Sequence, residues 1–183
     1  MTELTFTITF HGPFHIASGG NRDGITTIDP NDPLPATSLK GVMRASASRL
    51  LNEESTLVKR IFGSGRAPTP WRWSPAVPDD QGWANPQPAA RVSIDRTTGT
   101  ARSDMLAFSE HTQAAQASFH VTQNGFLDEE QLTLHRSALA ISGQAIRSIG
   151  GLRRRGLGWV SVQCTSHAPG LDDVRRLLEW RNA

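Results

Sequence analysis

Residues Leu4–Phe10 alternate strictly between apolar and polar side chains. The apolar set is Leu4, Phe6, Ile8 and Phe10, and the threonines Thr5, Thr7 and Thr9 lie between them. Because successive side chains of a β-strand point to opposite faces, this segment is typical of a strand that is buried on one face only. The sequence therefore predicts a sheet with one apolar and one polar face.

The other predicted elements alternate between helices and strands along the chain. Helices are expected from Thr37 or Ser38 onward, over 55–62, over 128–146 with Asp128 as the cap, and over 171–180. Strands are expected over 91–94, 105–108, 118–122 and 159–164. With a middle insertion set aside, the order β-α-β-β-α-β predicts an α+β protein with a ferredoxin-like or RRM-like fold.

The middle of the chain differs in character from the rest. Residues 64–90 have no periodicity and contain six prolines and the tryptophans Trp71, Trp73 and Trp83. Such a segment predicts an insertion or a functional loop rather than a layer of the core. We therefore expect one domain over 1–183, in which residues 65–105 form a Pro/Trp-rich insertion and a thumb-like hairpin with its turn at 95–100.

A glycine-rich loop with three consecutive arginines, Arg153, Arg154 and Arg155, precedes the last predicted strand. Glycine has no Cβ and permits positive φ, so the backbone of this loop can lie against another backbone. Guanidinium groups bind phosphate oxygens in pairs, which favours RNA or DNA as the ligand. A tight turn with solvated arginines is the alternative. A P-loop is disfavoured because no Gly-Lys-Ser/Thr follows.

Composition agrees with a nucleic-acid ligand and excludes several other classes of protein. The net charge is +2, and of the 19 basic residues only Lys40 and Lys59 are lysines, although a GC-rich genome would produce the same bias. One cysteine, Cys164, excludes an internal disulfide framework or a zinc site with several cysteines. We expect a cytoplasmic protein, because no apolar run is long enough to span a membrane and the first residues begin no signal peptide.

Four motifs together resemble the RAMP (repeat-associated mysterious protein) superfamily of CRISPR systems. They are Phe14–Gly20, the Asp29-Pro30 pair with Leu34–Arg44, the block Arg91–Ala101 with Glu110 and Phe119 beyond it, and the glycine-arginine loop. These motifs occur in the family's order and cover most of the chain apart from 65–88 and the C-terminal tail. The likeness is greatest to the repeated backbone subunit of type III effector complexes.

The resemblance implies an activity and a set of partners. Such subunits assemble head to tail with copies of themselves and other effector subunits along a guide RNA, and no membrane is involved. Each inserts a thumb into the guide–target duplex and cleaves target RNA with an aspartate and a divalent metal, Mg²⁺ or Mn²⁺. Asp23 occupies the matching place upstream of Asp29-Pro30, so it is the predicted catalytic and metal-binding residue. Asp29 and Asp32 are rivals, and Asp-Gly and Asp-Pro are also ordinary turn formers.

The predicted RNA-binding residues come from four parts of the chain. They are His15, Ser38, Lys40, Arg44, Arg96, Gly151, Arg153, Arg154 and Arg155. The first helix would contribute backbone N–H groups and a positive dipole to phosphate binding, and Arg44 has a solvated helix face as its alternative role. Phosphate contacts would give an affinity that is independent of sequence and sensitive to salt.

Several assignments have two interpretations at this stage. His15 either contacts RNA or supports the loop, or it is the general base of a metal-independent guide-processing nuclease. Asp95 and Arg96 either form a structural salt bridge or contact RNA, and Glu110 is expected to be structural. The three tryptophans stack on displaced bases or, as we prefer, pack against a neighbouring subunit. A non-catalytic scaffold that binds guide RNA remains a further possibility.

Overall fold

The computed structural model describes residues 2–52, 55–79, 81–153 and 156–182, without the side chains of 103–105 and 182. It confirms the α+β class. The main antiparallel sheet has the strand order β4-β8-β1-β9, and β5 also pairs with β8. These strands are β1 (Glu3–Phe10), β4 (Trp71–Trp73), β5 (Val77–Pro78), β8 (Gln116–Gln123) and β9 (Val160–Cys164).

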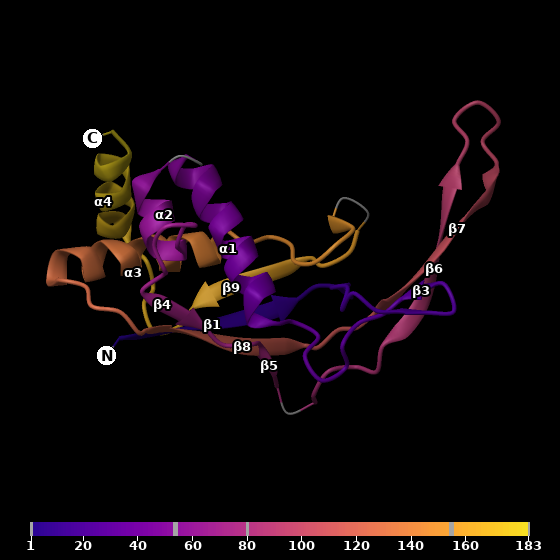
Figure 1. Ribbon diagram of the computed structural model, residues 1–183, viewed down its shortest axis with the longest axis horizontal. Helices are drawn as coiled ribbons and strands as arrows, with labels where there is room; N and C mark the ends of the chain where they lie inside the picture. Colours follow the sequence, from indigo (N-terminus) through magenta and orange to yellow (C-terminus); the bar gives the residue numbers. More distant parts are fainter. Residues whose placement is uncertain (1, 53–54, 80, 154–155, 183) are drawn as a thin grey trace.

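The helices lie on one side of this sheet (Figure 1). They are α1 (Ala36–Leu51), α2 (Thr56–Phe62), α3 (Glu129–Gln144) and α4 (Leu171–Asn182). Asp128 caps α3 as predicted, because its side chain accepts the Gln131 N–H at 2.8 Å. The helix predicted from Thr37 or Ser38 is present as α1, but its predicted N-cap was wrong: Pro35 is the N-cap and Ala36 begins the helix, since the φ of proline already suits this extended position. Over the ranges that the structure describes, no helix combines the length and hydrophobicity needed to cross a membrane.

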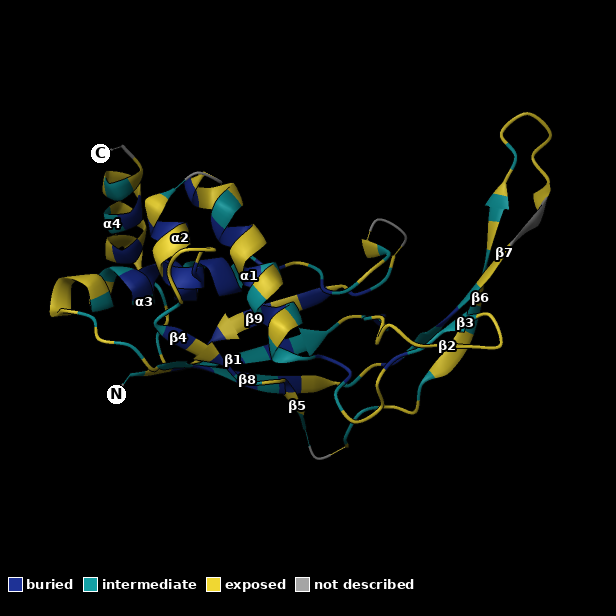
Figure 2. Cartoon of the chain, in the orientation of Figure 1, coloured by how far each residue is buried: buried dark blue, intermediate teal, exposed yellow. Residues whose placement is uncertain are grey.

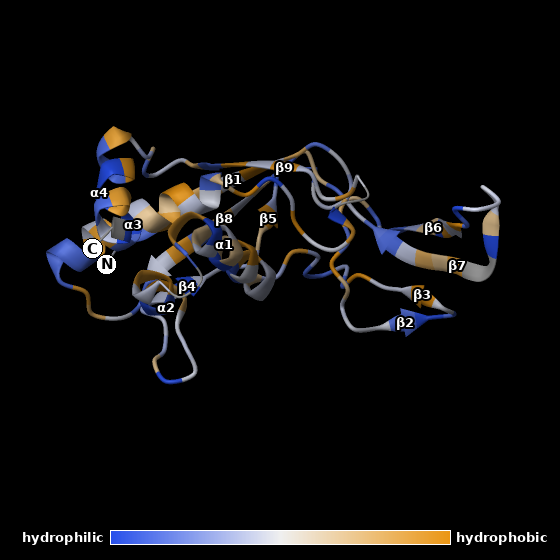
Figure 3. Ribbon diagram, turned by 90° about the horizontal axis from the view of Figure 1, so that it is seen from above, coloured by the Kyte–Doolittle hydropathy of each residue, from blue (hydrophilic) through white to orange (hydrophobic). Residues whose placement is uncertain are grey.

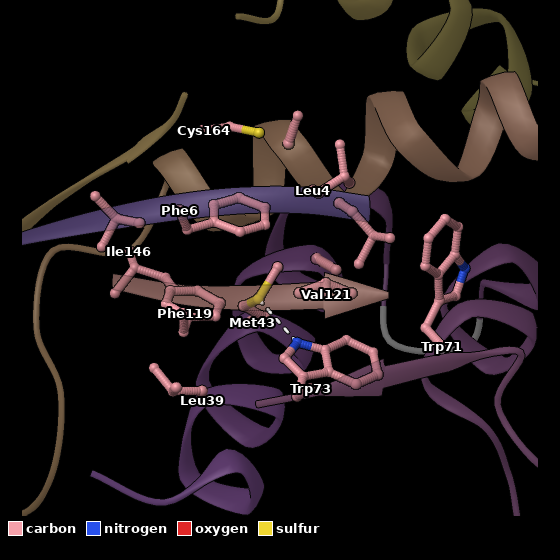
Figure 4. Close-up of a cluster of buried hydrophobic side chains, with 14 of the residues drawn as sticks. Leu4, Phe6, Leu39, Met43, Trp71, Trp73, Phe119, Val121, Ile146 and Cys164 are labelled. Carbon is pink, nitrogen blue, oxygen red and sulfur yellow. Dashed lines mark hydrogen bonds between the residues drawn. The ribbon is translucent and has the colours of Figure 1, made fainter. Parts of the chain in front are cut away.

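The apolar face predicted for the first strand is the centre of the core (Figure 4). Leu4, Phe6 and Ile8 are buried, and the Phe6 ring stacks on Phe119 of β8 with centroids 4.9 Å apart. Two parallel rings at this distance attract one another in addition to the apolar area that they remove from water. The pairing of β1 with β8 is therefore stabilised by side chains as well as by the backbone ladder.

Trp71 and Trp73 are core residues, so the expectation that they lie in an aperiodic insertion was wrong. They point inward from β4, with Arg72 exposed between them. The Trp73 Nε1–H lies 3.2 Å from the Met43 sulfur of α1, as the dashed line in Figure 4 shows. Three residues between proline-containing segments are too short to show a period of two, which is why the sequence hid this strand.

Trp83 also packs within its own chain rather than standing free. Its ring meets Phe10 and Phe14 edge-on, with centroids 5.7 and 5.6 Å away. The side chain is half-buried. For Trp71 and Trp73, packing inside the fold replaces the expected contacts with bases or with a neighbouring subunit.

A second sheet projects from the body and is largely exposed to solvent (Figures 1 and 2). Its order is β2-β3-β7-β6, with β2 (Asn21–Arg22), β3 (Ile25–Thr26), β6 (Gln87–Ile94) and β7 (Ala101–His111). The hairpin β6–β7 contains the two strands predicted around 95–100, and both are longer than predicted. Figure 3 shows β2–β3 at the same end of the molecule, where β3 runs parallel to β7.

The buried His135 makes the stability of the body dependent on pH. Its Nδ1 accepts the Trp71 Nε1–H at 3.1 Å, and burial lowers the pKa of His135 to about 4. The unfolded chain, with an ordinary histidine pKa near 6.5, binds more protons between these values. The stabilisation is therefore present above about pH 6.5 and is lost as pH falls toward 4.

We predict that His135→Gln flattens this dependence, because its amide oxygen can still accept the Trp71 N–H but does not titrate. The wild type should lose on the order of 3 kcal/mol of unfolding free energy more than the variant between pH 6.5 and 4, as about 1.4 kcal/mol corresponds to each pKa unit. Urea denaturation across this range measures the difference. Parallel pH curves for the two proteins would contradict the assignment.

Candidate nucleic-acid interface

The glycine-rich loop lies directly against the loop that follows β1. The Gly151 N–H donates to the His15 carbonyl at 2.8 Å, and Gly150 has φ +70°. A β-carbon on Gly150 would clash with that same carbonyl oxygen. The close backbone approach predicted from the glycines is therefore present, and it requires glycine at this position.

The two loops are also joined near the end of the glycine-rich loop. The Gly158 N–H donates to the Pro13 carbonyl at 2.8 Å, and the His11 N–H donates to the Trp159 carbonyl at 2.9 Å. Gly158 also has a positive φ, and a β-carbon there would clash with the Ile149 carbonyl. The first loop thus holds the start and the end of the arginine loop in place.

A groove of about 330 Å³ lies where these loops meet α1. Three of the predicted RNA-binding residues line it: Ser38 of α1, and Gly151 and Arg153 of the glycine-rich loop. Ile16 and Val42 give it an apolar wall. Segments more than one hundred residues apart in sequence therefore supply a backbone, a hydroxyl and a guanidinium to one surface.

The other predicted residues lie outside the groove lining. The Lys40 ammonium stands 5.4 Å from the centre of the Trp73 ring, and Arg44 is exposed on α1. Arg96 is exposed at the tip of the hairpin β6–β7. Arg154 and Arg155 lie outside the described residues.

Asp23 lies at the tip of β2–β3, in a two-residue turn with Gly24. Both residues have positive φ, 51° and 81°, which is the geometry of a type I′ turn and the usual reason for an Asp-Gly pair. The Asn21 side chain accepts the Gly24 N–H at 2.9 Å. The Asp23 side chain is exposed to solvent, so the turn displays this carboxylate rather than enclosing it.

The rival aspartates lie in the loop before α1. Asp29 Oδ1 accepts the Asn31 N–H at 2.9 Å, which forms a local turn. Burial, and then the nearby Asp29, raises the pKa of Asp32. Nowhere in the described part of the chain do three or more His, Cys, Asp or Glu side chains gather in a metal-binding arrangement. A divalent ion at Asp23 would therefore need oxygen ligands from RNA or water in addition to the one carboxylate.

The turn of the hairpin is organised by Asp95. Its Oδ1 accepts the Thr97 and Thr98 N–H groups at 2.8 and 3.3 Å, and Arg102 lies 3.4 Å from its Oδ2. The two amides, and then Arg102, keep the pKa of Asp95 below its ordinary value. Asp95 thus shapes the turn, which presents Arg96 to solvent.

His15 joins the glycine-rich loop to the base of the hairpin. The side chain is buried, and Nδ1 lies 2.7 Å from the Glu110 carbonyl. A carbonyl only accepts, so Nδ1 donates in this hydrogen bond, and Nε2 is the ring nitrogen that points away from it. The Glu110 carboxylate accepts the Ile28 N–H at 2.9 Å, in agreement with the structural role expected for it.

Two residues at this junction were not expected from the sequence. The His111 ring lies 6.2 Å from the His15 ring, and burial, then His15, then Arg91 lower the pKa of His111. The alternation of side chains along each strand shows which residues of that strand share a face. To place Arg91 of one strand beside His111 of the other, the pairing register of the hairpin is needed as well.

Comparison with known proteins decides the family. The family model of the RAMP superfamily matches residues 7–161, which is most of the chain. The protein belongs to the RAMP superfamily. Both loops, the groove and the hairpin of this RAMP protein lie within the matched residues.

Solved structures share the fold of this RAMP protein at low sequence identity. One is described as "Cryo-EM structure of the Type III-B Cmr-beta bound to cognate target RNA", with TM-score 0.67, 10% identity, and coverage of 89% of this chain and 97% of that chain. A second is the "Type III-B Cmr-beta Cryo-EM structure of the Apo state", with TM-score 0.66, 11% identity and the same coverage. No curated protein matches the chain.

We predict that Gly158→Ala lowers the free energy of unfolding by about 2 kcal/mol more than Gly156→Ala. Both glycines have positive φ and share a conformational cost of roughly 1–2 kcal/mol, but only the β-carbon at 158 meets another backbone. Urea denaturation measures the difference. Equal losses in the two variants would show that the loops do not approach as described.

Proposed function

We propose that this RAMP protein is a guide-RNA-binding backbone subunit of a type III-like CRISPR effector complex, and that it cleaves target RNA with a divalent metal. The observation that carries the proposal is the convergence of Ser38, Gly151 and Arg153 on one groove. The likeness to chains of Cmr-beta complexes, one of them bound to target RNA, supports it.

The strand arrangement supports the proposal as well. In the order β9-β1-β8-β4, helices α1 and α2 connect β1 to β4, and α3 connects β8 to β9. This is the connection that a ferredoxin-like or RRM-like βαββαβ fold requires, and we assign that fold to the body. The thumb is the hairpin β6–β7, which projects away from the body (Figure 1).

In the groove, RNA would be held by its backbone. Arg153 would pair with phosphate oxygens, the Ser38 hydroxyl would donate or accept one hydrogen bond, and Ile16 and Val42 would contact a sugar or base edge. None of these contacts depends on base identity. A subunit that binds guides of any sequence needs contacts of this kind.

Cleavage would take place at the β2–β3 tip, where Asp23 is displayed. The adjacent 2′-hydroxyl of the target would lose its proton to water and attack the phosphorus once the phosphate is held in line. The bond from phosphorus to the 5′-oxygen of the next nucleotide would break, and the products would be a 2′,3′-cyclic phosphate and a protonated 5′-hydroxyl. Bound Mg²⁺ or Mn²⁺, held by the Asp23 carboxylate and RNA oxygens, would supply a positive charge for the developing negative charge. Asp29 and Asp32 are the alternative ligands.

One observation favours a second function. Glu110 holds the His15 ring through Nδ1, and a general base in metal-independent processing of repeat RNA would take a proton at Nε2. A non-catalytic guide-binding scaffold with the same groove is the third possibility. Metal dependence and the effect of His15→Ala on repeat RNA separate the three functions.

We predict that Asp23→Ala, in the assembled complex with guide RNA and Mg²⁺, lowers the rate of target cleavage by roughly 100-fold or more while guide binding persists. Asp29→Ala is the matched control and should cut at close to the wild-type rate. Denaturing gels of labelled target RNA measure both. Normal cutting by Asp23→Ala would rule out this residue, and a wild-type complex that captures target without metal-dependent product would identify a scaffold.

A further inference from the structure

The base of the hairpin β6–β7 carries Arg91 and His111 on one face. In the register of the hairpin, Gln87 pairs with His111 and Arg91 pairs with Ala107. Because side chains two residues apart share a face, Arg91, Ser109 and His111 lie on the same side. His111 Nε2 lies 3.1 Å from the buried Ser109 hydroxyl, and its ring faces His15.

Among the described residues, no carboxylate pairs with Arg91 or His111. Arg91 makes no hydrogen bond or ion pair among the residues that the structure describes, and its Nε is buried without a partner. The one carboxylate on the adjoining strand position, Glu110, points to the opposite face and accepts the Ile28 N–H. The causes of the lowered pKa of His111 are burial, His15 and Arg91, with no carboxylate among them.

The buried Arg91 Nε, which lies near the His111 ring and has no hydrogen-bond partner among the described residues, is unfavourable unless an anion completes the site. A buried polar atom without a hydrogen bond costs free energy. An oxyanion would accept hydrogen bonds from Arg91 and His111 at once. The chemistry of the group therefore selects phosphate-like ligands.

The position of the group identifies the source of the phosphate. The His15 ring belongs to it, and the backbone carbonyl of the same residue holds Gly151, which lines the groove on α1. His15 therefore lies between the groove and the base of the hairpin, and one strand of RNA that crosses His15 can contact both sites.

We propose that Arg91 and His111, with His15, form a second phosphodiester-binding site, which holds the RNA strand as it passes from the groove to the thumb. This inference rests on the proposed RNA-binding function. It adds two residues to that function and predicts where the strand leaves the groove.

The test measures the affinity of the full chain for single-stranded RNA at several salt concentrations. Arg91→Gln should weaken binding about tenfold and reduce the salt slope by about one, as expected for one lost phosphate contact. The groove variant Arg153→Gln should behave in the same way. The control Arg175→Gln removes a charge that is already ion-paired with Asp172 on α4, and it should bind as the wild type does.

A second measurement separates a binding role from a structural one. Because the Arg91 Nε has no hydrogen-bond partner among the described residues, Arg91→Gln should leave the melting temperature unchanged or raise it. The NMR signal of the His111 ring should move on addition of RNA, with inorganic phosphate as the comparison probe. A shift with inorganic phosphate but none with RNA would overturn the assignment of the ligand.

The outcomes distinguish this site from the function on which it rests. If Arg153→Gln weakens binding while Arg91→Gln binds with wild-type affinity and slope, the second site is wrong and the groove stands. If the wild type binds no RNA even at low salt, both the groove and the second site are wrong.

Discussion

The interaction on which the rest of the arrangement depends is the contact between the His15 carbonyl and the backbone of Gly150 and Gly151. It joins two loops that are far apart in sequence, and it is possible only because Gly150 has no side chain. Through this contact the arginine loop is held beside the start of α1. The ring of the same histidine bonds the Glu110 carbonyl, so one residue fixes both the groove and the base of the projecting hairpin.

The local structure of several segments could be predicted from the sequence, because their signals are local. Strict alternation identified β1, Asp128 identified the start of α3, and the glycines predicted a close backbone approach. Strand β4 could not be predicted in this way. This strand has only three residues, too few to establish an alternation between buried and exposed side chains, and the neighbouring prolines are typical of a loop.

The candidate site was predictable only in part, for a different physical reason. Ser38, Gly151 and Arg153 each lie in a motif, and their convergence confirms that they share a surface. The partners of His15 depend on how β7 is placed against the first loop, and the grouping of Arg91 with His111 depends on the hairpin register. Long-range pairing of this kind leaves no mark in the spacing of residues along the chain. For Asp23 the local structure is a sufficient explanation of the sequence. The turn requires positive φ at Asp23 and Gly24, so the Asp-Gly pair by itself does not indicate a catalytic role.

We propose that RNA runs along the surface where the glycine-rich loop, the first loop and α1 meet. Ultraviolet cross-linking of the full chain to single-stranded RNA, followed by mass spectrometry of the peptides, tests it most directly. The account predicts cross-linked peptides that contain Ile16, Ser38 and Arg153, with none from α4 at the far end of the body (Figure 1). Cross-links confined to α4 or to the polar face of the main sheet would contradict it.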